Sequence, residues 1–445
     1  MKYINMKYLK LTFLIALWAI LQTASAQDVL SKDQAVQMIL EQNFDVLRAA
    51  NMTRIAENNT DKGAIGYNPV VNANASSSIN YGSSFQQLAS GDEIKAANAS
   101  TVAGNAGVTL QYNFYEGGRR DLTLDQLLET VKLTELQKRQ QVEFSILEML
   151  LGYYQVANLT NTVASLTETQ EVSSRRLTRA QFSFDYGQGN KLQVLNAEVD
   201  MNRDSVNLRD AEQQLANAKR DVNVLLARAV DTPFEVDTAL IYAEDLSVEL
   251  LLGGALDSNT QILMAYKNLV LFDYDRQLIE TSRRPIIGVD ATMSGNFSKN
   301  LTTSSFIDFQ SRYGPSAGIG LVWNLWDGGL RNVQRDNNQI QIENQELSIH
   351  QIEQQLERDI RNAWQVYENA MFVLDIERHN LRTNEDNFQR TQEQFNIGQV
   401  TSVEFRQAQF NMVNAQISLS TARYTAKVAE LRVLQLSGLI LDASF

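Results

Sequence analysis

Strict alternation of apolar and polar residues marks four segments of the chain as strands. The segments are about residues 69–82, 104–115, 286–297 and 315–326. In each segment one set of alternate positions is mostly apolar, and the other set is mostly Asn, Ser, Thr, Gln or Gly. A period of two over this length is typical of a strand with one apolar and one hydrated face. The polar stretches at about residues 85–101 and 298–313 predict loops that join the strands in pairs.

Long helices account for most of the remaining chain. We expect them at about residues 31–66, 118–182, 191–229, 248–281, 328–394 and 402–436. In the last of these, a seven-residue recurrence predicts a coiled-coil seam, which consists of Val403, Phe410, Ile417, Tyr424 and Leu431. Residues 208–225 carry a similar seam with apolar steps of three and four. A helix of about 65 residues is about 100 Å long, so the pattern favours rods over a globular core.

The chain is a tandem duplication. Residues 112–118 (YNFYEGG) match residues 323–329 (WNLWDGG) at a displacement of 211 residues. Residues 184–188 (FDYGQ) match residues 395–399 (FNIGQ) at the same displacement, and one shared offset is hard to explain by chance. We therefore expect two repeats, 27–245 and 246–445, each with a helix, two strands and a helical hairpin. The hairpin tips are predicted near residues 185–190 and 396–401.

The first 26 residues have the features of a signal peptide. Three lysines precede an apolar run at residues 11–21, and Ala24-Ser25-Ala26 is a small-residue cleavage site. The apolar run is too short to cross a bilayer, which needs about 20 residues. The mature chain is then expected to begin at Gln27 and to be exported without a transmembrane helix.

The composition narrows the possible chemistry. The chain has no cysteine, two histidines (His350 and His379) and a formal net charge of −13. These counts exclude disulfides and thiol chemistry, and they disfavour histidine metal clusters, a cofactor site and nucleic acid as a partner. The sequence therefore offers little for an enzyme and predicts no catalytic, cofactor-binding or metal-binding residues.

A sheet of four two-faced strands has consequences for assembly. If the apolar face met lipid, open sheet edges could not persist there, because unpaired backbone groups in a bilayer cost several kcal/mol each. Two copies would give eight strands, which leave an interior filled by side chains, whereas three copies give twelve and room for a conduit. Aromatic residues at the ends of the strands next to the helices would then form an interfacial girdle; they are Tyr67, Tyr112, Phe114, Tyr115, Trp323 and Trp326. The alternative is a secreted coiled coil or adhesin with β-structure attached.

The motifs together resemble the TolC-like outer membrane efflux proteins. The resemblance rests on residues 30–35 (LSKDQA), residues 67–69 (YNP), the aromatic-acid-Gly-Gly end of each strand pair and the Phe-x-x-Gly turn of each hairpin. It implies an α+β membrane protein in which long coiled-coil hairpins and four strands per chain form a trimeric twelve-stranded β-barrel and a periplasmic α-barrel. The protein would lie in the outer membrane of a Gram-negative bacterium, with a large periplasmic portion.

The resemblance also implies partners and a function. The homotrimer would contact outer membrane lipid and meet a periplasmic adaptor, or membrane fusion protein, which links it to an inner-membrane pump. It would passively conduct small molecules such as drugs. The alternatives that stay open are a type I protein secretion channel and a structural coiled-coil envelope protein that is not a channel.

Candidate site residues follow from the matching positions. The adaptor-docking tips would be Tyr186, Gly187, Gln188, Ile397, Gly398 and Gln399, although the glycines could serve only the chain reversal. Positions that form an ionic lock in the family are Gln193, Phe395 and Val400 here, which cannot form the same ion pairs. Glu404, with Gln407 beside it, matches an acidic ring at the constriction, although a solvated glutamate is an equal reading.

Overall fold

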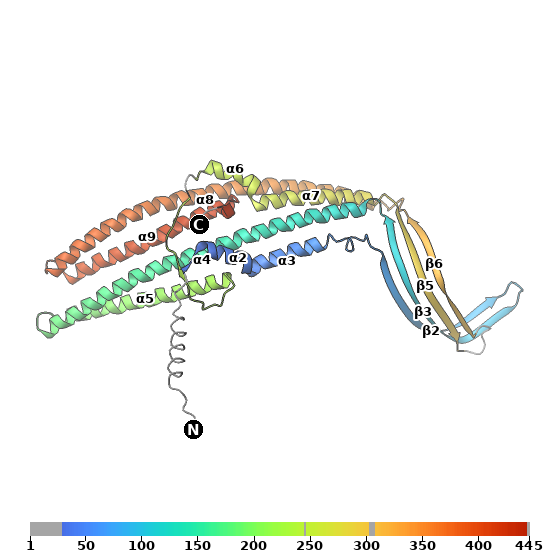
Figure 1. Ribbon diagram of the computed structural model, residues 1–445, viewed down its shortest axis with the longest axis horizontal. Coiled ribbons are helices and arrows are strands. Elements are labelled where there is room, and N and C mark those ends of the chain that lie inside the picture. The colour runs from blue at the N-terminus through green and yellow to red at the C-terminus, as the bar shows by residue number, and fades with distance from the viewer. Residues whose placement is uncertain (1–28, 244–245, 302–307, 443–445) are drawn as a thin grey trace, which may run out of the picture. The chain divides into compact units, whose positions relative to one another are not determined.

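The computed structural model describes residues 29–243, 246–301 and 308–442 (Figure 1). The expected signal peptide, residues 1–26, lies outside the described residues. The described residues divide into two compact units: those within Met1–Asn51, Leu136–Met264 and His350–Phe445 form one, and those within Met52–Glu135 and Ala265–Ile349 form the other. Each unit draws on both sequence repeats, so the repeats are interleaved in space.

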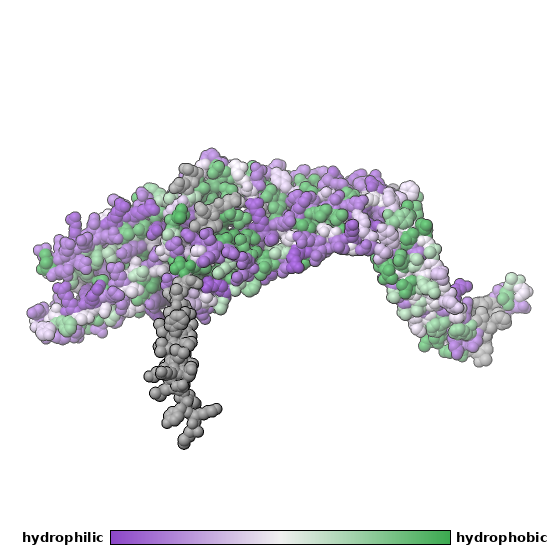
Figure 2. Space-filling model, in the orientation of Figure 1, coloured by the Kyte–Doolittle hydropathy of each residue, from purple (hydrophilic) through white to green (hydrophobic). Residues whose placement is uncertain are grey.

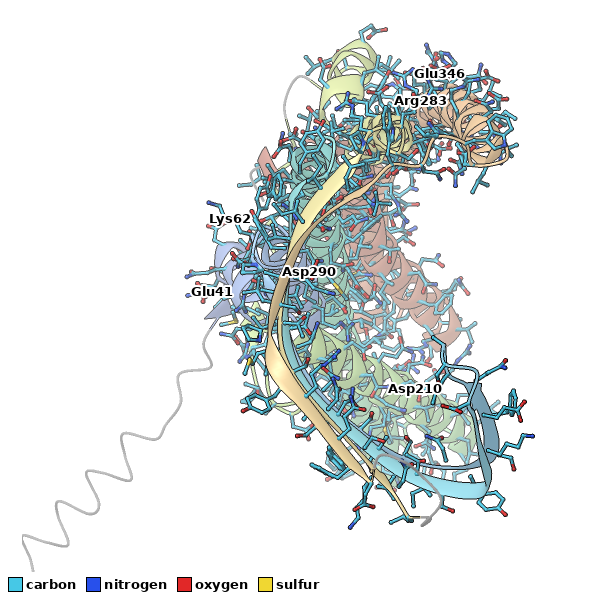
Figure 3. All side chains as sticks on the ribbon, turned by 90° about the vertical axis from the view of Figure 1, so that its right-hand side faces the viewer. Glu41, Lys62, Asp210, Arg283, Asp290 and Glu346 are labelled. Atoms are coloured by element: carbon cyan, nitrogen blue, oxygen red, sulfur yellow. The ribbon has the colours of Figure 1, made fainter. Side chains whose placement is uncertain are left out.

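A four-stranded antiparallel sheet belongs to the second unit. Its strands are β2 (Val70–Gln87), β3 (Glu93–Tyr115), β5 (Ile286–Asn300) and β6 (Phe309–Val322), in the order β2-β3-β5-β6. Side chains project from both faces of the sheet (Figure 3). The register aligns Val71, Leu110, Ala291 and Ala317 in one row and the polar residues Asn72, Thr109, Thr292 and Ser316 in the next. The four predicted apolar faces therefore share one face of the sheet, which confirms the two-faced sheet.

The strands differ from their predicted bounds, mostly by extending into the predicted loops. β2 and β3 continue to a short turn at Gly91, with a φ of 90°, and include much of the predicted loop 85–101. Likewise β6 begins at Phe309 instead of about residue 315 and ends at Val322 instead of residue 326. The extensions have no regular alternation of apolar and polar residues, so the pattern could not reveal them, whereas backbone pairing needs no alternation. Pro315 lies inside β6, which is an edge strand and tolerates a missing N–H on its open side.

Two long helical hairpins carry most of the chain. α4 (Arg119–Asp185) with α5 (Lys191–Leu225) forms the first, and α8 (Leu330–Asn396) with α9 (Ser402–Leu436) forms the second. The predicted rods are confirmed, because α4 and α8 each have 67 residues. Hydrophilic residues cover most of the visible surface of the hairpins toward their tips (Figure 2). No helix among the described residues is long and apolar enough to cross a membrane.

Two predicted continuous helices are each broken at an asparagine. The pieces are α2 (Lys32–Gln42), α3 (Phe44–Asn58), α6 (Val248–Ser258) and α7 (Thr260–Thr281). Asn43 accepts from two backbone N–H groups of α3, and its amide donates to the Leu225 carbonyl at 2.9 Å. Asn259 makes the same contacts with α7 and with the Leu436 carbonyl at 2.9 Å. Each break thus anchors a bent helix pair to the end of one hairpin.

The core of the first unit surrounds the connector between the repeats. Short parallel strands β1 (Val29–Leu30) and β4 (Glu235–Val236) pair there, and a 3-10 helix, η1 (Ile440–Asp442), closes the described chain. The Tyr153 hydroxyl donates to the Leu30 carbonyl at 2.8 Å and accepts from the Asp237 N–H at 2.8 Å. Through these two hydrogen bonds Tyr153, which is fully buried, ties the N-terminal segment and the connector to α4.

The predicted seam is buried or half-buried along its whole length in α5 but only away from the tip in α9. In α5 the seam is confirmed, because Ala211 and Val222 are buried and the other seam residues are half-buried. In α9 it holds at Tyr424 and Leu431 but not near the tip, where Val403 is 72% exposed. A straight α-helix drifts by about 20° per heptad, and Phe405 lies on the buried side of α9 there instead.

Candidate docking tips and constriction

The tip of the first hairpin is a Schellman turn. The Gln188 N–H donates to the Ser183 carbonyl at 2.8 Å, and the Gly187 N–H donates to the Phe184 carbonyl at 2.9 Å. Gly187 has a φ of 72°, a conformation that costs little for glycine. The side chain of Asn190 then caps α5 by accepting from the Gln193 N–H at 2.9 Å. The backbone of Gly187 thus lets α4 end and α5 begin within a few residues.

The tip of the second hairpin repeats this backbone. The Gln399 N–H donates to the Gln394 carbonyl at 2.8 Å, and Gly398 has a φ of 77°. Here Thr401 and Glu404 form a capping box at the start of α9. The predicted tip residues are all exposed, with Tyr186 at 78% and Ile397 at 69%. Both tips are therefore accessible in one chain, and their role in docking stays a prediction.

The three residues at the expected lock positions do not converge within one chain. Phe395 stacks on Phe405, with ring centroids 4.7 Å apart and planes 24° apart. The Arg179 guanidinium lies 5.8 Å from the Phe395 centroid. Among the described residues, no hydrogen bond or ion pair joins the side chain of Gln193 to Phe395 or Val400. Phe395 instead belongs to an aromatic contact between α8, α9 and α4.

Glu404 has a structural role that the sequence reading did not assign. Its carboxylate accepts from the Thr401 N–H at 2.7 Å and from the Thr401 hydroxyl at 2.9 Å. These hydrogen bonds, the backbone one first, lower the pKa of Glu404 below its ordinary value. Gln407 is exposed and donates to the side chain of Asn411 at 2.8 Å. Glu404 therefore stays ionised near neutral pH, and an acidic ring at a constriction stays a prediction.

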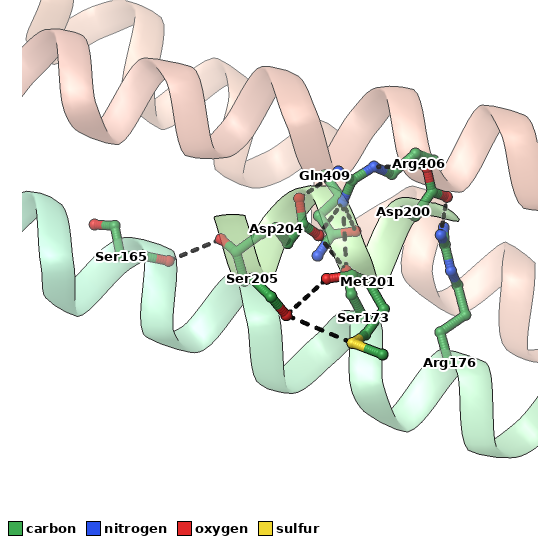
Figure 4. Close-up of polar contacts among 10 residues, drawn as sticks. Ser165, Ser173, Arg176, Asp200, Met201, Asp204, Ser205, Arg406 and Gln409 are labelled. Atoms are coloured by element: carbon green, nitrogen blue, oxygen red, sulfur yellow. Dashed lines mark hydrogen bonds and ion pairs between the residues drawn. The ribbon is translucent and has the colours of Figure 1, made fainter. Parts of the chain in front are cut away.

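Sequence reasoning missed a buried ionic network near the tips (Figure 4). The Arg406 guanidinium of α9 donates to both carboxylate oxygens of Asp204 on α5, at 2.8 and 2.6 Å. Arg406 also lies 3.7 Å from Asp200, which pairs with Arg176 of α4. The Ser173 hydroxyl, fully buried on α4, donates to Asp204. The network joins the first hairpin to α9 through charges that water reaches poorly.

The sequence shows the acidic residues of this network but not their cationic partner. Asp200 and Asp204 are four residues apart, so they share one face of α5, and a like-charged pair there is unfavourable unless a cation meets it. The cation, Arg406, lies 202 residues from Asp204. A single sequence does not reveal that distant partner.

Comparison with known proteins places the chain in a family. The family model of the outer membrane efflux proteins matches residues 35–228 and 251–439. The chain belongs to the outer membrane efflux protein family. The two matched ranges fall within the two sequence repeats. A relative in this family, the outer membrane efflux protein BepC of Brucella suis, is 20% identical over 337 residues, which are 76% of this chain and 72% of that protein.

Solved structures share the fold of this outer membrane efflux protein. The CmeC outer membrane channel of Campylobacter jejuni superposes with a TM-score of 0.72 at 13% identity, covering 92% of this chain and 86% of that one. The MtrE outer membrane channel of Neisseria gonorrhoeae gives a TM-score of 0.66 at 14% identity, covering 92% and 89%. The chain thus belongs to a family of outer membrane efflux proteins and has the fold of these outer membrane channels.

Proposed function

We propose that three copies of this chain form a passive export conduit, which a periplasmic adaptor connects to an inner-membrane pump. The observation that carries the proposal is the sheet. Its apolar face is exposed in one chain, as Ile319 at 78% shows, and β2 and β6 are its two edges. Lipid would cover the apolar face, but unpaired edges are too costly in a bilayer. Pairing β6 of one copy with β2 of the next satisfies both edges.

The number of copies follows from the size of the resulting barrel. Two copies give about eight strands and an interior filled by side chains, whereas three copies give about twelve and an open lumen. The opposite face of the sheet suits that lumen, because its rows are polar; Thr109 and Thr292 share a hydroxyl hydrogen bond of 3.1 Å there. Asp290 lies on the same face of β5.

The helices also expose surfaces that suit a second copy. On α5 four exposed apolar residues follow steps of three, four and seven, and on α8 three of the exposed apolar residues follow steps of seven, as in a coiled-coil seam. These residues are Leu192, Leu195, Val199 and Val206 on α5, and Val333, Ile340 and Leu347 on α8. Side chains this exposed in a repeating stripe favour burial against neighbouring subunits.

In this role the subunit contributes a route and no chemistry. The pump supplies the energy and selects the cargo, and small molecules such as drugs are the cargo we propose. Deleting the gene should increase drug susceptibility, and the purified protein should conduct ions in planar bilayers. Normal drug susceptibility of the deletion strain together with an absence of conductance would overturn the proposal.

A further inference from the structure

The two hairpin tips share a backbone but differ in charge. The displacement of 211 residues pairs Arg175 with Asp386 and Phe182 with Glu393. We define the α4 tip surface as Arg175, Arg179, Phe182 and Tyr186, and the α8 tip surface as Asp386, Arg390, Glu393 and Ile397. All eight residues are exposed. The α4 tip surface has two cations and two aromatic rings, whereas the α8 tip surface has two carboxylates and one cation.

The α4 tip surface forms a continuous face. Its residues follow steps of four, three and four, so they lie along one side of α4. They line a groove of about 360 Å³ that reaches Gln188 in the turn. Phe182 is 58% exposed and Tyr186 is 78% exposed. Aromatic side chains usually bury a larger part of their surface in a core or an interface. A groove that combines arginine and exposed aromatic side chains has the composition of a protein-binding hot spot.

The positive charges of Arg175 and Arg179 are not neutralised by a carboxylate among the described residues. Among the described residues Arg175 makes no ion pair, and Arg179 contacts the neutral Asn396 side chain at 3.3 Å and the ring of Phe395. The acids nearest in sequence on α4, Glu171 and Asp185, are exposed and pair with neither arginine. The guanidiniums therefore attract an anion that is not supplied by this chain.

We propose that the α4 tip surface binds a helical segment of the periplasmic partner that presents carboxylates beside an apolar stripe. The carboxylates would accept paired N–H bonds from Arg175 and Arg179, and the apolar stripe would pack on Phe182 and Tyr186. Binding at this surface rests on the proposed function, which places the adaptor at the tips.

The same partner segment would be repelled by the α8 tip surface. Asp386 and Glu393 stand where the first hairpin has Arg175 and Phe182, so like charges would face each other. The net charge of −13 for the whole chain opposes an acidic partner elsewhere on the subunit. The two tips of one chain are therefore not interchangeable docking sites, despite their common backbone.

Site-specific photocross-linking in cells that express the native adaptor tests this proposal. A photoreactive residue replaces Gln188 in one strain and Gln399 in another, and mass spectrometry identifies the adaptor peptide that each one captures. We expect Gln188 to capture a net-negative peptide that the Gln399 probe does not capture. Arg175→Glu with Arg179→Glu should lower the yield at least tenfold, whereas the matched pair Asp386→Lys with Glu393→Lys should not.

Each outcome supports or overturns the proposal. A neutral or basic captured peptide, equal capture of one peptide at both tips, or a yield unchanged by the arginine reversal would overturn the acidic partner while leaving tip docking intact. Absence of capture at both tips would overturn tip docking as well. If the reversal removes trimers from the membrane, the pair Arg175→Gln with Arg179→Gln, which removes both positive charges without adding negative ones, replaces it with the same expected loss.

Discussion

At the scale of residues, the tip glycines and the buried network have different roles at the hairpin ends: the glycines allow the turn, and the network holds the helices together. Gly187 and Gly398 hold positive φ in turns whose neighbours are exposed. A substitution there strains the turn without removing a core contact, because no heavy atom lies within 4 Å of a Cβ added at either glycine. Arg406, by contrast, pairs with the buried Asp204 and the half-buried Asp200, so its loss affects packing between the hairpins.

Substituting valine at Gly187 or Gly398 should abolish export and leave trimers in the membrane. A β-branched residue at positive φ costs on the order of 1–3 kcal/mol, which distorts the turn but is small beside the stability of a long hairpin. Drug susceptibility and heat-modifiable migration on gels measure the two effects. Gly253→Ala, in helix α6 with open space around it, is the matched control. Equal loss of trimers would mean that the turn glycines serve folding rather than docking.

Removing Arg406 should loosen the hairpins near their tips. Arg406→Gln leaves Asp204, which is 3% exposed, without its cation, and breaking one partner of such a buried pair costs about 3–5 kcal/mol. Hydrogen exchange at the tips should rise in this variant and should partly recover when Asp204→Asn is added. Arg209→Gln, which breaks an exposed pair with Glu212, should change little. Similar exchange in both single variants would show that the buried network contributes no stability.

At the scale of elements, the sequence predicts the long helices and the faces of the strands well. Alternation at Val71, Leu110 and Ala291 determined one face because burial in lipid or protein selects every second residue. The breaks at Asn43 and Asn259 could not be predicted, because their amide partners lie 182 and 177 residues away. The same holds for the candidate site. The tip turns could be predicted because they are local motifs, whereas the Arg406 network could not, because it is a tertiary contact.

The start of α9 should become less protected as the pH falls. Hydrogen bonds from Thr401 lower the pKa of Glu404, so its stabilising effect is fully present above the ordinary value of 4.5 and is lost as the pH falls through the lower, folded pKa. Hydrogen exchange of residues 402–408 should therefore increase between pH 7 and pH values below 4. Glu404→Gln, which can keep the capping geometry without ionising, should abolish this pH dependence. A wild-type response that persists in Glu404→Gln would assign the titration to another group.

At the scale of the whole molecule, an assembled pore would bring together features that one chain holds apart. The exposed stripe on α5, the exposed stripe on α8 and the two sheet edges all lack partners among the described residues. A ring of three Glu404 carboxylates would also exist only in such an assembly. In the proposed assembly, one subunit would specify its neighbours through these surfaces, which are unfavourable in isolation.

Glu404→Gln should reduce the cation selectivity of the assembled channel. Three carboxylates facing a narrow passage attract cations, and the capping box leaves the charge of each Glu404 intact. Reversal potentials in planar bilayers under a salt gradient measure the change, and block by multivalent cations from the periplasmic side should weaken with it. Unchanged selectivity would place Glu404 outside the lumen.

The central claim is that three copies close one barrel, and cryo-electron microscopy of the detergent-extracted protein tests it most directly. The account predicts a three-fold symmetric particle in which β6 of each subunit pairs with β2 of the next, with four strands from each chain. The polar face of the sheet should line the lumen, and the face with Val71 and Ile319 should meet detergent. A stable monomer, or a barrel closed within one chain, would contradict the account.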